Sequence, residues 1–177
     1  KLSYTDYQHQ EIDANVIDTT FSNKSTQSRL EIQHQLQLIK GLIGFQSSNS
    51  DFAALGSQMI VPATHSDYYS LFALESLKHD AISYQLGVRG ESQQLHPQFG
   101  IDKHYIPLGA SASMTWDATQ QQHITLAFTH TQRAPQIQEL YAKGVHDATH
   151  SYEVGNMNLQ KERSNSIELR YQLPVSY

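Results

Sequence analysis

Apolar and polar residues alternate with a period of two along most of this chain, and the 3.6-residue period of an amphipathic helix is almost never seen. In the segment "ISYQLGVR", Ile82, Tyr84, Leu86 and Val88 share one face and polar residues share the other. Comparable alternation marks about eight segments as strands: residues 2–12, 29–36, 41–48, 68–76, 81–90, 108–116, 122–129 and 167–173. The pattern predicts an all-β protein with antiparallel strands.

The expected connections form two sets that alternate along the chain. The short ones cover residues 37–40, 77–80 and 117–120, and the long ones cover residues 13–19, 49–67, 94–105 and 135–163. An up-and-down antiparallel sheet would collect the short turns at one end and the long loops at the other. Outer-membrane β-barrels have this arrangement, with short periplasmic turns and long extracellular loops. A transmembrane barrel is therefore favoured, and a soluble β-sandwich binding module is the alternative.

Composition supports the barrel. Hydrophobic residues make up 38% of the chain, below the 45–50% that is usual for soluble domains, as expected if the polar strand faces line a wet interior. The charged side chains of Glu168 and Arg170 would be costly in a dry core and ordinary in a hydrated lumen. The aromatic residues near strand ends suit the girdles at membrane interfaces: Tyr68, Tyr69, Tyr105 and Trp116.

Several other classes of protein are excluded or disfavoured. The chain has no cysteine, so it has no disulfide framework and no thiolate metal site. Its net charge of -5 argues against a nucleic-acid partner. No stretch of about 18 apolar residues predicts a membrane helix, and no signal peptide is apparent. Nucleophile-elbow, phosphate-loop and HExxH motifs are absent, so no enzymatic activity is expected.

A series of motif residues lies between the last two expected strands. They are Arg133-Ala134-Pro135, Glu139-Leu140-Tyr141, Gly155-Asn156, Leu159, Glu162 and Ser164. This series resembles the mid-barrel motifs of TonB-dependent outer-membrane receptors. The resemblance implies a cell outer membrane location in a Gram-negative bacterium, contact with membrane lipid, and a partner in the TonB energy-transducing complex, which is reached through an N-terminal plug domain.

The resemblance also sets an expectation for domain organisation. Receptors of this kind have a barrel of about 22 strands around a plug. Residues 1–177 would then be part of one barrel domain, a mid-barrel fragment that lacks the plug and the remaining strands. The rival interpretation is a complete, non-transporting eight-stranded barrel, which the length permits and the motifs disfavour.

One branch of the family is more similar to the loop sequence than the others. The zinc-importing receptors resemble this chain at Ala142, Gly144, His146, Ala148, Thr149, Tyr152, Glu153, Gly155 and Asn156. This similarity implies a transported metal, with zinc as the cargo. A haem or siderophore-like chelate is the alternative, because "QRAP" and "NMNL" bracket His146 and His150 as they do in haem receptors.

Candidate metal ligands come from the long-loop end of the expected sheet. They are the histidines His65, His96, His104, His146 and His150, with the carboxylates Asp147 and Glu153. Neutral imidazole binds zinc well, and carboxylates can complete a tetrahedral site. The competing explanation is that each exposed loop histidine is only a solvated polar residue.

The remaining motif residues have structural explanations. Pro135 cannot donate to a β-ladder and would end its strand. Arg133 would pair with a carboxylate, Glu139 or Glu168, and so fix the base of the loop. Gly155-Asn156 has the composition of a turn with positive φ.

Overall fold

The computed structural model describes residues 1–13, 15–56, 59–146 and 151–173. Its strands are β1 (Leu2–Asp13), β2 (Val16–Leu36), β3 (Ile39–Gly56), β4 (Thr64–His79), β5 (Ile82–Pro97), β6 (Lys103–Tyr105), β7 (Leu108–Asp117), β8 (His123–Arg133), β9 (Lys143–His146), β10 (Ser151–Val154) and β11 (Glu162–Gln172). Within these described ranges the one helix is α1 (Ile137–Tyr141), and no helix is long and apolar enough to cross a membrane.

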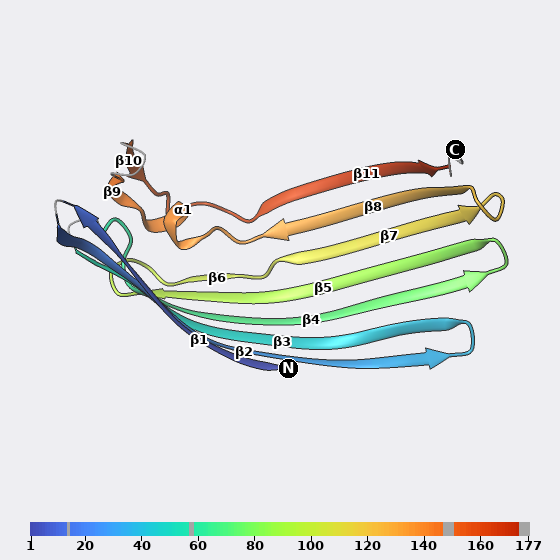
Figure 1. The fold of residues 1–177 in the computed structure, drawn as a ribbon, viewed down its shortest axis with the longest axis horizontal. Helices are drawn as coiled ribbons and strands as arrows, with labels where there is room; N and C mark the ends of the chain where they lie inside the picture. Colours follow the sequence, from blue (N-terminus) through green and yellow to red (C-terminus); the bar gives the residue numbers. More distant parts are fainter. Residues whose placement is uncertain (14, 57–58, 147–150, 174–177) are drawn as a thin grey trace.

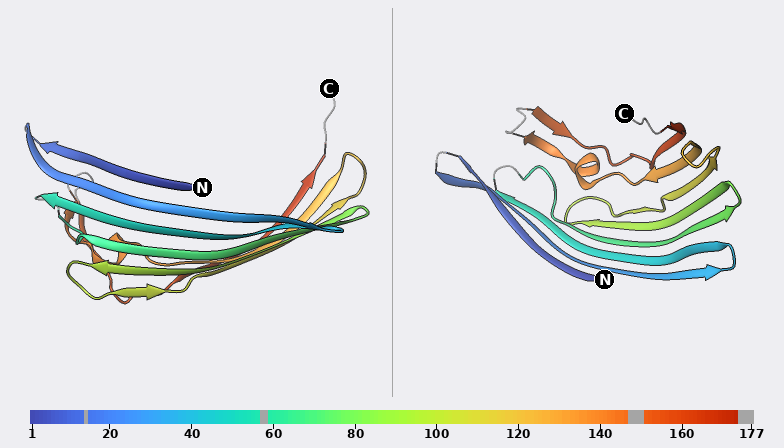
Figure 2. Two further views of the ribbon diagram at one scale, coloured as in Figure 1. Left: turned by 90° about the horizontal axis from the view of Figure 1, so that it is seen from below. Right: turned by 45° about the vertical axis from the view of Figure 1, so that its right-hand side comes forward.

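The strands form an antiparallel meander. The order across the main sheet is β1-β2-β3-β4-β5-β7-β8-β11, β6 adds to β5, and β9 and β10 form a separate hairpin. Figure 1 shows the strands lying side by side, with tight connections at one end and α1, β9 and β10 at the other. We call these ends the turn end and the loop end. The two views of Figure 2 show that the sheet is curved, as expected for part of a barrel wall.

The connections at the turn end are short, as predicted. β2 ends at Leu36 and β3 begins at Ile39, while β4 ends at His79 and β5 begins at Ile82. Gln37 and Asp80 adopt positive φ values of 53° and 52°, a conformation common in tight hairpins. These two hairpins therefore reverse with two residues between the strands, and the β7–β8 connection has five, residues 118–122.

The predicted long connection at residues 13–19 is wrong. β1 ends at Asp13 and β2 begins at Val16, with Asn15 at a φ of 64°. The predicted connections at 49–67 and 94–105 are also shorter than expected, because β3 continues to Gly56 and β5 to Pro97. These extensions do not alternate, because polar residues occupy both faces at 49–51 and apolar residues occupy both faces at 52–55, although the backbone ladder continues.

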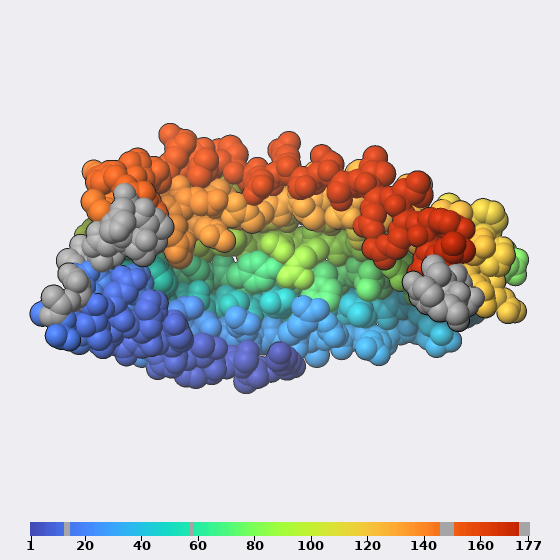
Figure 3. Space-filling view, turned by 45° about the horizontal axis from the view of Figure 1, so that its top comes forward, coloured from blue at the N-terminus to red at the C-terminus, as the bar shows by residue number. Residues whose placement is uncertain are grey.

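The apolar face of the sheet is exposed. Leu86, Leu126 and Leu169 are 58%, 49% and 73% exposed, and the register places them on one face with the other alternating apolar residues. Figure 3 shows the strands as one continuous wall. A sandwich would bury this face against a second sheet, so the soluble-sandwich alternative is wrong. An apolar surface of this extent requires an apolar surrounding such as lipid.

The four aromatic residues that were expected in membrane-interface girdles lie in three different environments. Tyr69 and Trp116 lie on the apolar face, toward its loop end and turn end respectively, and are about half exposed. Tyr68 instead lies on the polar face, where its hydroxyl donates to Glu91 at 2.9 Å. Tyr105 is 9% exposed in a small core. Only Tyr69 and Trp116 of the four predicted residues occupy girdle-like positions.

The opposite face carries a polar network around one aromatic ring. Phe72 lies across β3 at Gly44, where a Cβ atom would be only 2.2 Å from the ring. The guanidinium carbons of Arg29 and Arg89 lie 4.4 and 5.3 Å from the ring centroid, and Gln46 Oε1 accepts bonds from both side chains. The charged and amide side chains of this network fit the polar interior of a barrel.

Candidate functional site

The loop end contains the motif residues and most of the predicted ligands. It is formed by the segments that join β3 to β4, β5 to β7 and β8 to β11 (Figures 1 and 2). The β8–β11 segment is the longest, and it begins where β8 ends at Arg133. Pro135, which has no N–H group for the ladder, is buried directly after that strand.

Arg133 fixes the base of this segment through three hydrogen bonds. Its Nη1 and Nη2 donate to Glu139 Oε2 and Oε1, both at 2.9 Å, and its Nε donates to Glu162 Oε2 at 2.9 Å. Glu139 is thus the partner, while Glu168 bonds to Arg170 instead. Because Glu162 begins β11, one guanidinium ties the end of β8, the helix α1 and the returning strand together.

Glu139 also organises the first turn of α1. Its Oε2 accepts the Gln136 backbone N–H at 2.7 Å, which is one half of a capping box. The hydrogen bonds from Arg133, and then that backbone bond, lower the pKa of Glu139 to about 2. The bonds to Glu139 and Glu162 raise the pKa of Arg133. Both groups therefore stay charged at every physiological pH.

A small apolar core holds α1 against the wall. Its buried members are Leu95, Tyr105, Ala134 and Leu140, and Ile137, Tyr141 and Leu159 pack against them. Two tyrosine hydroxyls connect this core to neighbouring backbone: Tyr105 donates to the Leu159 carbonyl at 3.1 Å, and Tyr141 donates to the Ile101 carbonyl at 2.8 Å. The loop end is consequently a packed structure over much of its described length.

Gly155 and Asn156 bring the returning chain back to α1. Gly155 N–H donates to the Ala142 carbonyl at 2.6 Å, and Asn156 N–H donates to the Glu139 carbonyl at 2.8 Å. A Cβ atom on Gly155 would lie 2.6 Å from the Leu140 carbonyl carbon and 2.7 Å from the Ala142 nitrogen. The predicted positive φ is wrong: neither residue has one. Glycine is required here because two backbones come into direct contact.

Two of the predicted ligands, His65 and His96, lie opposite each other on β4 and β5. Their ring centroids are 6.3 Å apart. His65 Nδ1 donates to Asp51 Oδ1 at 2.7 Å, and its Nε2 lies 3.4 Å from Asp67 Oδ2. His96 Nδ1 lies 2.8 Å from Asp102 Oδ2. We call these five residues the histidine–aspartate cluster.

The carboxylates of the cluster favour the protonated form of His65. Asp51, through its hydrogen bond, raises the pKa of His65 above its ordinary value, and Asp67 adds to the effect. Among the described residues no three His, Cys, Asp or Glu side chains are already arranged to bind a metal ion. For His65 to become a ligand, one ring nitrogen must be unprotonated and must leave its present partner.

The histidine–aspartate cluster lies on one particular face of the sheet. Asp51, His65 and His96 occupy the same face of the sheet as the exposed apolar residues, continued toward the loop end. The cluster therefore lies on the outer surface of the wall. The polar network around Phe72 lies on the inner surface.

The other predicted ligands that the structure describes lie apart from this cluster at the loop end. His104 lies on β6, and its Nε2 is 3.0 Å from Ser92 Oγ. Glu153 lies on β10 opposite Gly144. His146 ends β9, and its side chain is not described, while Asp147 and His150 lie outside the described residues.

Sequence reasoning missed three partners of the histidines. Asp51, Asp67 and Asp102 were not among the candidates, although Asp67 follows His65 by two residues and so shares its strand face. Asp51 could be found only from the β3–β4 register, which brings it opposite His65. Alternation cannot fix that register when both faces of the strand extensions are polar.

Comparison with known families agrees with the architecture. A family model described as TonB dependent receptor-like, beta-barrel, matches residues 2–175. The match covers nearly the whole chain and includes every strand of the meander. The open antiparallel sheet, its exposed apolar face and its packed loop end are all expected of that barrel. The chain therefore belongs to the β-barrel family of TonB-dependent receptors, which are outer-membrane transporters of Gram-negative bacteria.

Proposed function

We propose that this receptor imports a metal ion, with zinc as the cargo. The observation that carries the proposal is the histidine–aspartate cluster at the loop end, which faces the cell exterior in this family. Imidazole nitrogen and carboxylate oxygen are the donors that zinc prefers when thiolates are absent. His65 and His96, on neighbouring strands, supply two imidazoles, and Asp51, Asp67 and Asp102 supply nearby carboxylates.

In this proposal the cluster acts as a capture site on the rim. Zinc would compete with protons for a ring nitrogen of His65 and draw His96 toward the same ion. Because the present bonds hold both rings to carboxylates, binding would require only local rotation of side chains on two paired strands. Such a site would release zinc readily as protons compete for the same nitrogens.

Titration of the purified full-length receptor with zinc chloride tests the proposal. Replacing both His65 and His96 with alanine should weaken zinc binding by about tenfold or more, the scale found for disturbed metal sites. His79→Ala is the matched control, because His79 also lies near a carboxylate, Asp80 at 3.7 Å, but at the turn end. An unchanged zinc affinity in the double variant would show that the cluster does not bind zinc.

A second candidate cargo is an organic metal chelate, including haem. A cavity of about 630 Å³ lies among the loop-end segments. Its lining includes the exposed apolar residues Met59, Phe99, Ile101, Val154 and Met157, beside Tyr141 of the motif. A bare ion makes no apolar contacts with such a surface, whereas a chelate with apolar edges could bury those edges there. A haem-dependent absorption band in the purified receptor, with no response to zinc, would favour this candidate.

A further inference from the structure

The cavity at the loop end, with a volume of about 630 Å³, is enclosed by three separate connections of the chain. Its lining comes from residues within 59–62, between β3 and β4, within 99–103, between β5 and β7, and within 140–143 and 154–158 of the β8–β11 segment. Lys103 pairs with Leu95 in the β5–β6 ladder, and Leu95 lies on the same face of β5 as Arg89. This register places the cavity on the lumen side of the wall.

Two hydrogen bonds hold the walls of this cavity together. The Tyr141 hydroxyl donates to the Ile101 carbonyl at 2.8 Å, which joins the β8–β11 segment to the β5–β7 connection. The Lys143 N–H group donates to the Ile60 carbonyl at 2.8 Å, which joins the same segment to the β3–β4 connection. The cavity is therefore formed before a ligand arrives, and binding there requires little ordering of the chain.

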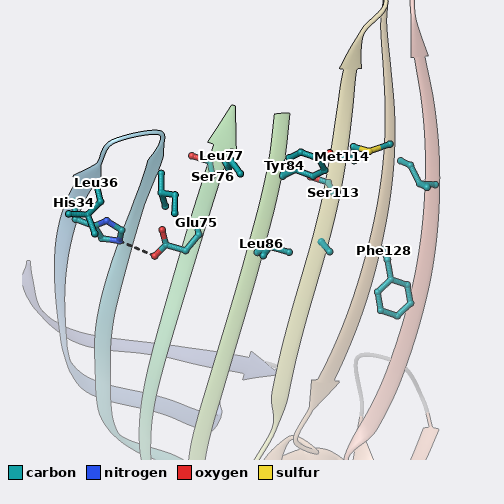
Figure 4. A pocket seen from close by; sticks show the side chains of 13 residues that line it. His34, Leu36, Glu75, Ser76, Leu77, Tyr84, Leu86, Ser113, Met114 and Phe128 are labelled. Carbon is teal, nitrogen blue, oxygen red and sulfur yellow. Dashed lines mark hydrogen bonds and ion pairs between the residues drawn. The ribbon is translucent and has the colours of Figure 1, made fainter. Parts of the chain in front are cut away.

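A larger hollow, of about 940 Å³, lies on the outer face toward the turn end (Figure 4). His34 Nε2 and Glu75 Oε1, which are 2.9 Å apart, lie at one side of it, and apolar side chains such as Leu86 and Phe128 lie at the other. Acyl chains of the membrane cover that face in this family, so the hollow needs no other ligand. The loop-end cavity differs because it lies beyond the apolar band, where acyl chains do not reach its apolar residues.

The lining of the loop-end cavity carries positive charge and no negative charge. Lys103 and Lys143 line it without any aspartate or glutamate, although the chain as a whole has a net charge of -5. Among the described residues, no lysine ion pair includes either of them. Lys103 is also half-buried, and an ammonium group that is shielded from water without a partner is costly.

The rest of the lining is mainly apolar and restricts the ligand further. Met59 and Met157 come from different connections, and their unbranched side chains can adapt to ligands of varied shape. A free divalent cation would be repelled by the two lysines. An uncharged apolar molecule would bury the lysines without compensating their charge. The lining therefore suits a molecule that is both apolar and negatively charged.

We propose that the cavity binds an anionic ligand with an apolar body, such as a carboxylate or sulfonate on an aromatic frame. The Lys103 ammonium group donates hydrogen bonds to the anionic group, and the body packs against Phe99, Ile101 and the two methionines. As a cargo site the cavity rests on the second candidate function above, to which the lysines add that a chelate taken up here carries negative charge. Free zinc belongs instead to the histidine–aspartate cluster, where three carboxylates gather.

Fluorescence titration of the full-length receptor in lipid nanodiscs tests the site with two dyes that share one apolar body. Anilinonaphthalene sulfonate carries a negative charge, and phenylnaphthylamine has the same frame without the sulfonate. After the signal of empty nanodiscs is subtracted, the sulfonate dye should bind the receptor saturably. An absence of saturable binding would show that another part of the receptor fills the cavity, and would overturn the proposal.

Two lysine variants locate the binding. Lys103→Met removes the charge and keeps an unbranched side chain, so it should weaken binding of the sulfonate dye about tenfold, the scale of a hydrogen bond between charged groups. Binding of phenylnaphthylamine should stay unchanged. Lys24→Met is the matched control, because Lys24 lies on the outer face at the loop end, 3.6 Å from Asp6, and it should change neither dye. An equal loss of both dyes in Lys103→Met, or no loss of either, would contradict the proposal.

Competition on the unaltered receptor keeps the test decisive if Lys103→Met does not fold. Naphthalene carboxylate should displace the sulfonate dye about tenfold better than naphthalene carboxamide, which has the same shape without the charge. Equal displacement by the two compounds would overturn the proposal. Replacing His65 and His96 should not alter dye binding, and Lys103→Met should not alter zinc affinity, so a failure at one site can be distinguished from a failure at the other.

Discussion

Replacing Gly155 with alanine should loosen the whole base of the β8–β11 segment. The added Cβ would meet the Leu140 and Ala142 backbones at 2.6 and 2.7 Å, and a backbone cannot rotate aside as a side chain can. Overpacking of this kind costs about 1–3 kcal/mol. Hydrogen exchange of the backbone amides in residues 137–142 should accelerate about tenfold to a hundredfold, since exchange follows local opening.

Gly109→Ala provides the control for that experiment. The nearest atom to a Cβ at Gly109 is the His130 carbonyl oxygen at 3.8 Å, an ordinary contact. This variant should exchange like the unaltered receptor in residues 137–142. Equal protection in the Gly155→Ala variant would show that the close approach of the two backbones is not what holds the segment.

Replacing Arg133 with glutamine should have the second-largest effect, because it removes three hydrogen bonds from one residue. Glu139 and Glu162 would be left facing each other without their shared cation. Limited proteolysis of the full-length receptor should cut between β8 and β11 about three- to tenfold faster, as cleavage follows the open population. Arg170→Gln, which breaks only the exposed pair with Glu168, should leave cleavage unchanged.

The effect of Arg133→Gln should depend on pH in one direction. The pKa of Glu139 is lowered to about 2 from an ordinary 4.5, so the stabilisation from this pair is fully present above about pH 4.5 and is lost as the pH falls toward 2. Amide exchange in α1 should therefore differ between the variant and the unaltered receptor at neutral pH and converge near pH 2. A difference that persists at pH 2 would assign the stabilisation to another interaction.

The fold could be predicted from the sequence because strands with one face in lipid must alternate apolar and polar residues strictly. In β5 and β11 the period-two pattern coincides with strands that the structure contains, and the exposed Leu86 and Leu169 verify which face is apolar. The pattern failed where that constraint ends. Beyond the apolar band β2 continues through a polar stretch, so the first hairpin was mistaken for a long loop.

The site was harder to predict from the sequence, because its contacts depend on the register of the strands and on distant segments that come together in the fold. The Arg133–Glu139 pair is local and could be proposed from spacing, but the bond to Glu162 requires β11 to return beside β8. The same limit applies to the hydrogen bond between His34 and Glu75, which are 41 residues apart in the sequence. Only the β2–β3–β4 register brings them together across Gly41.

Contact between membrane lipid and the apolar face of the sheet is the central claim. Residues 1–177 contain no cysteine, so single cysteines placed along β5 at residues 83–88 can each carry a nitroxide label in the membrane-embedded receptor, with any cysteine elsewhere replaced by serine. Collisions between the nitroxide label and lipid-soluble oxygen should follow a period of two. They should be frequent for labels at residues 84, 86 and 88 and infrequent for labels at residues 83, 85 and 87. Low accessibility at Leu86 and Val88 to both oxygen and a water-soluble quencher, as in a dry protein interior, would contradict the account.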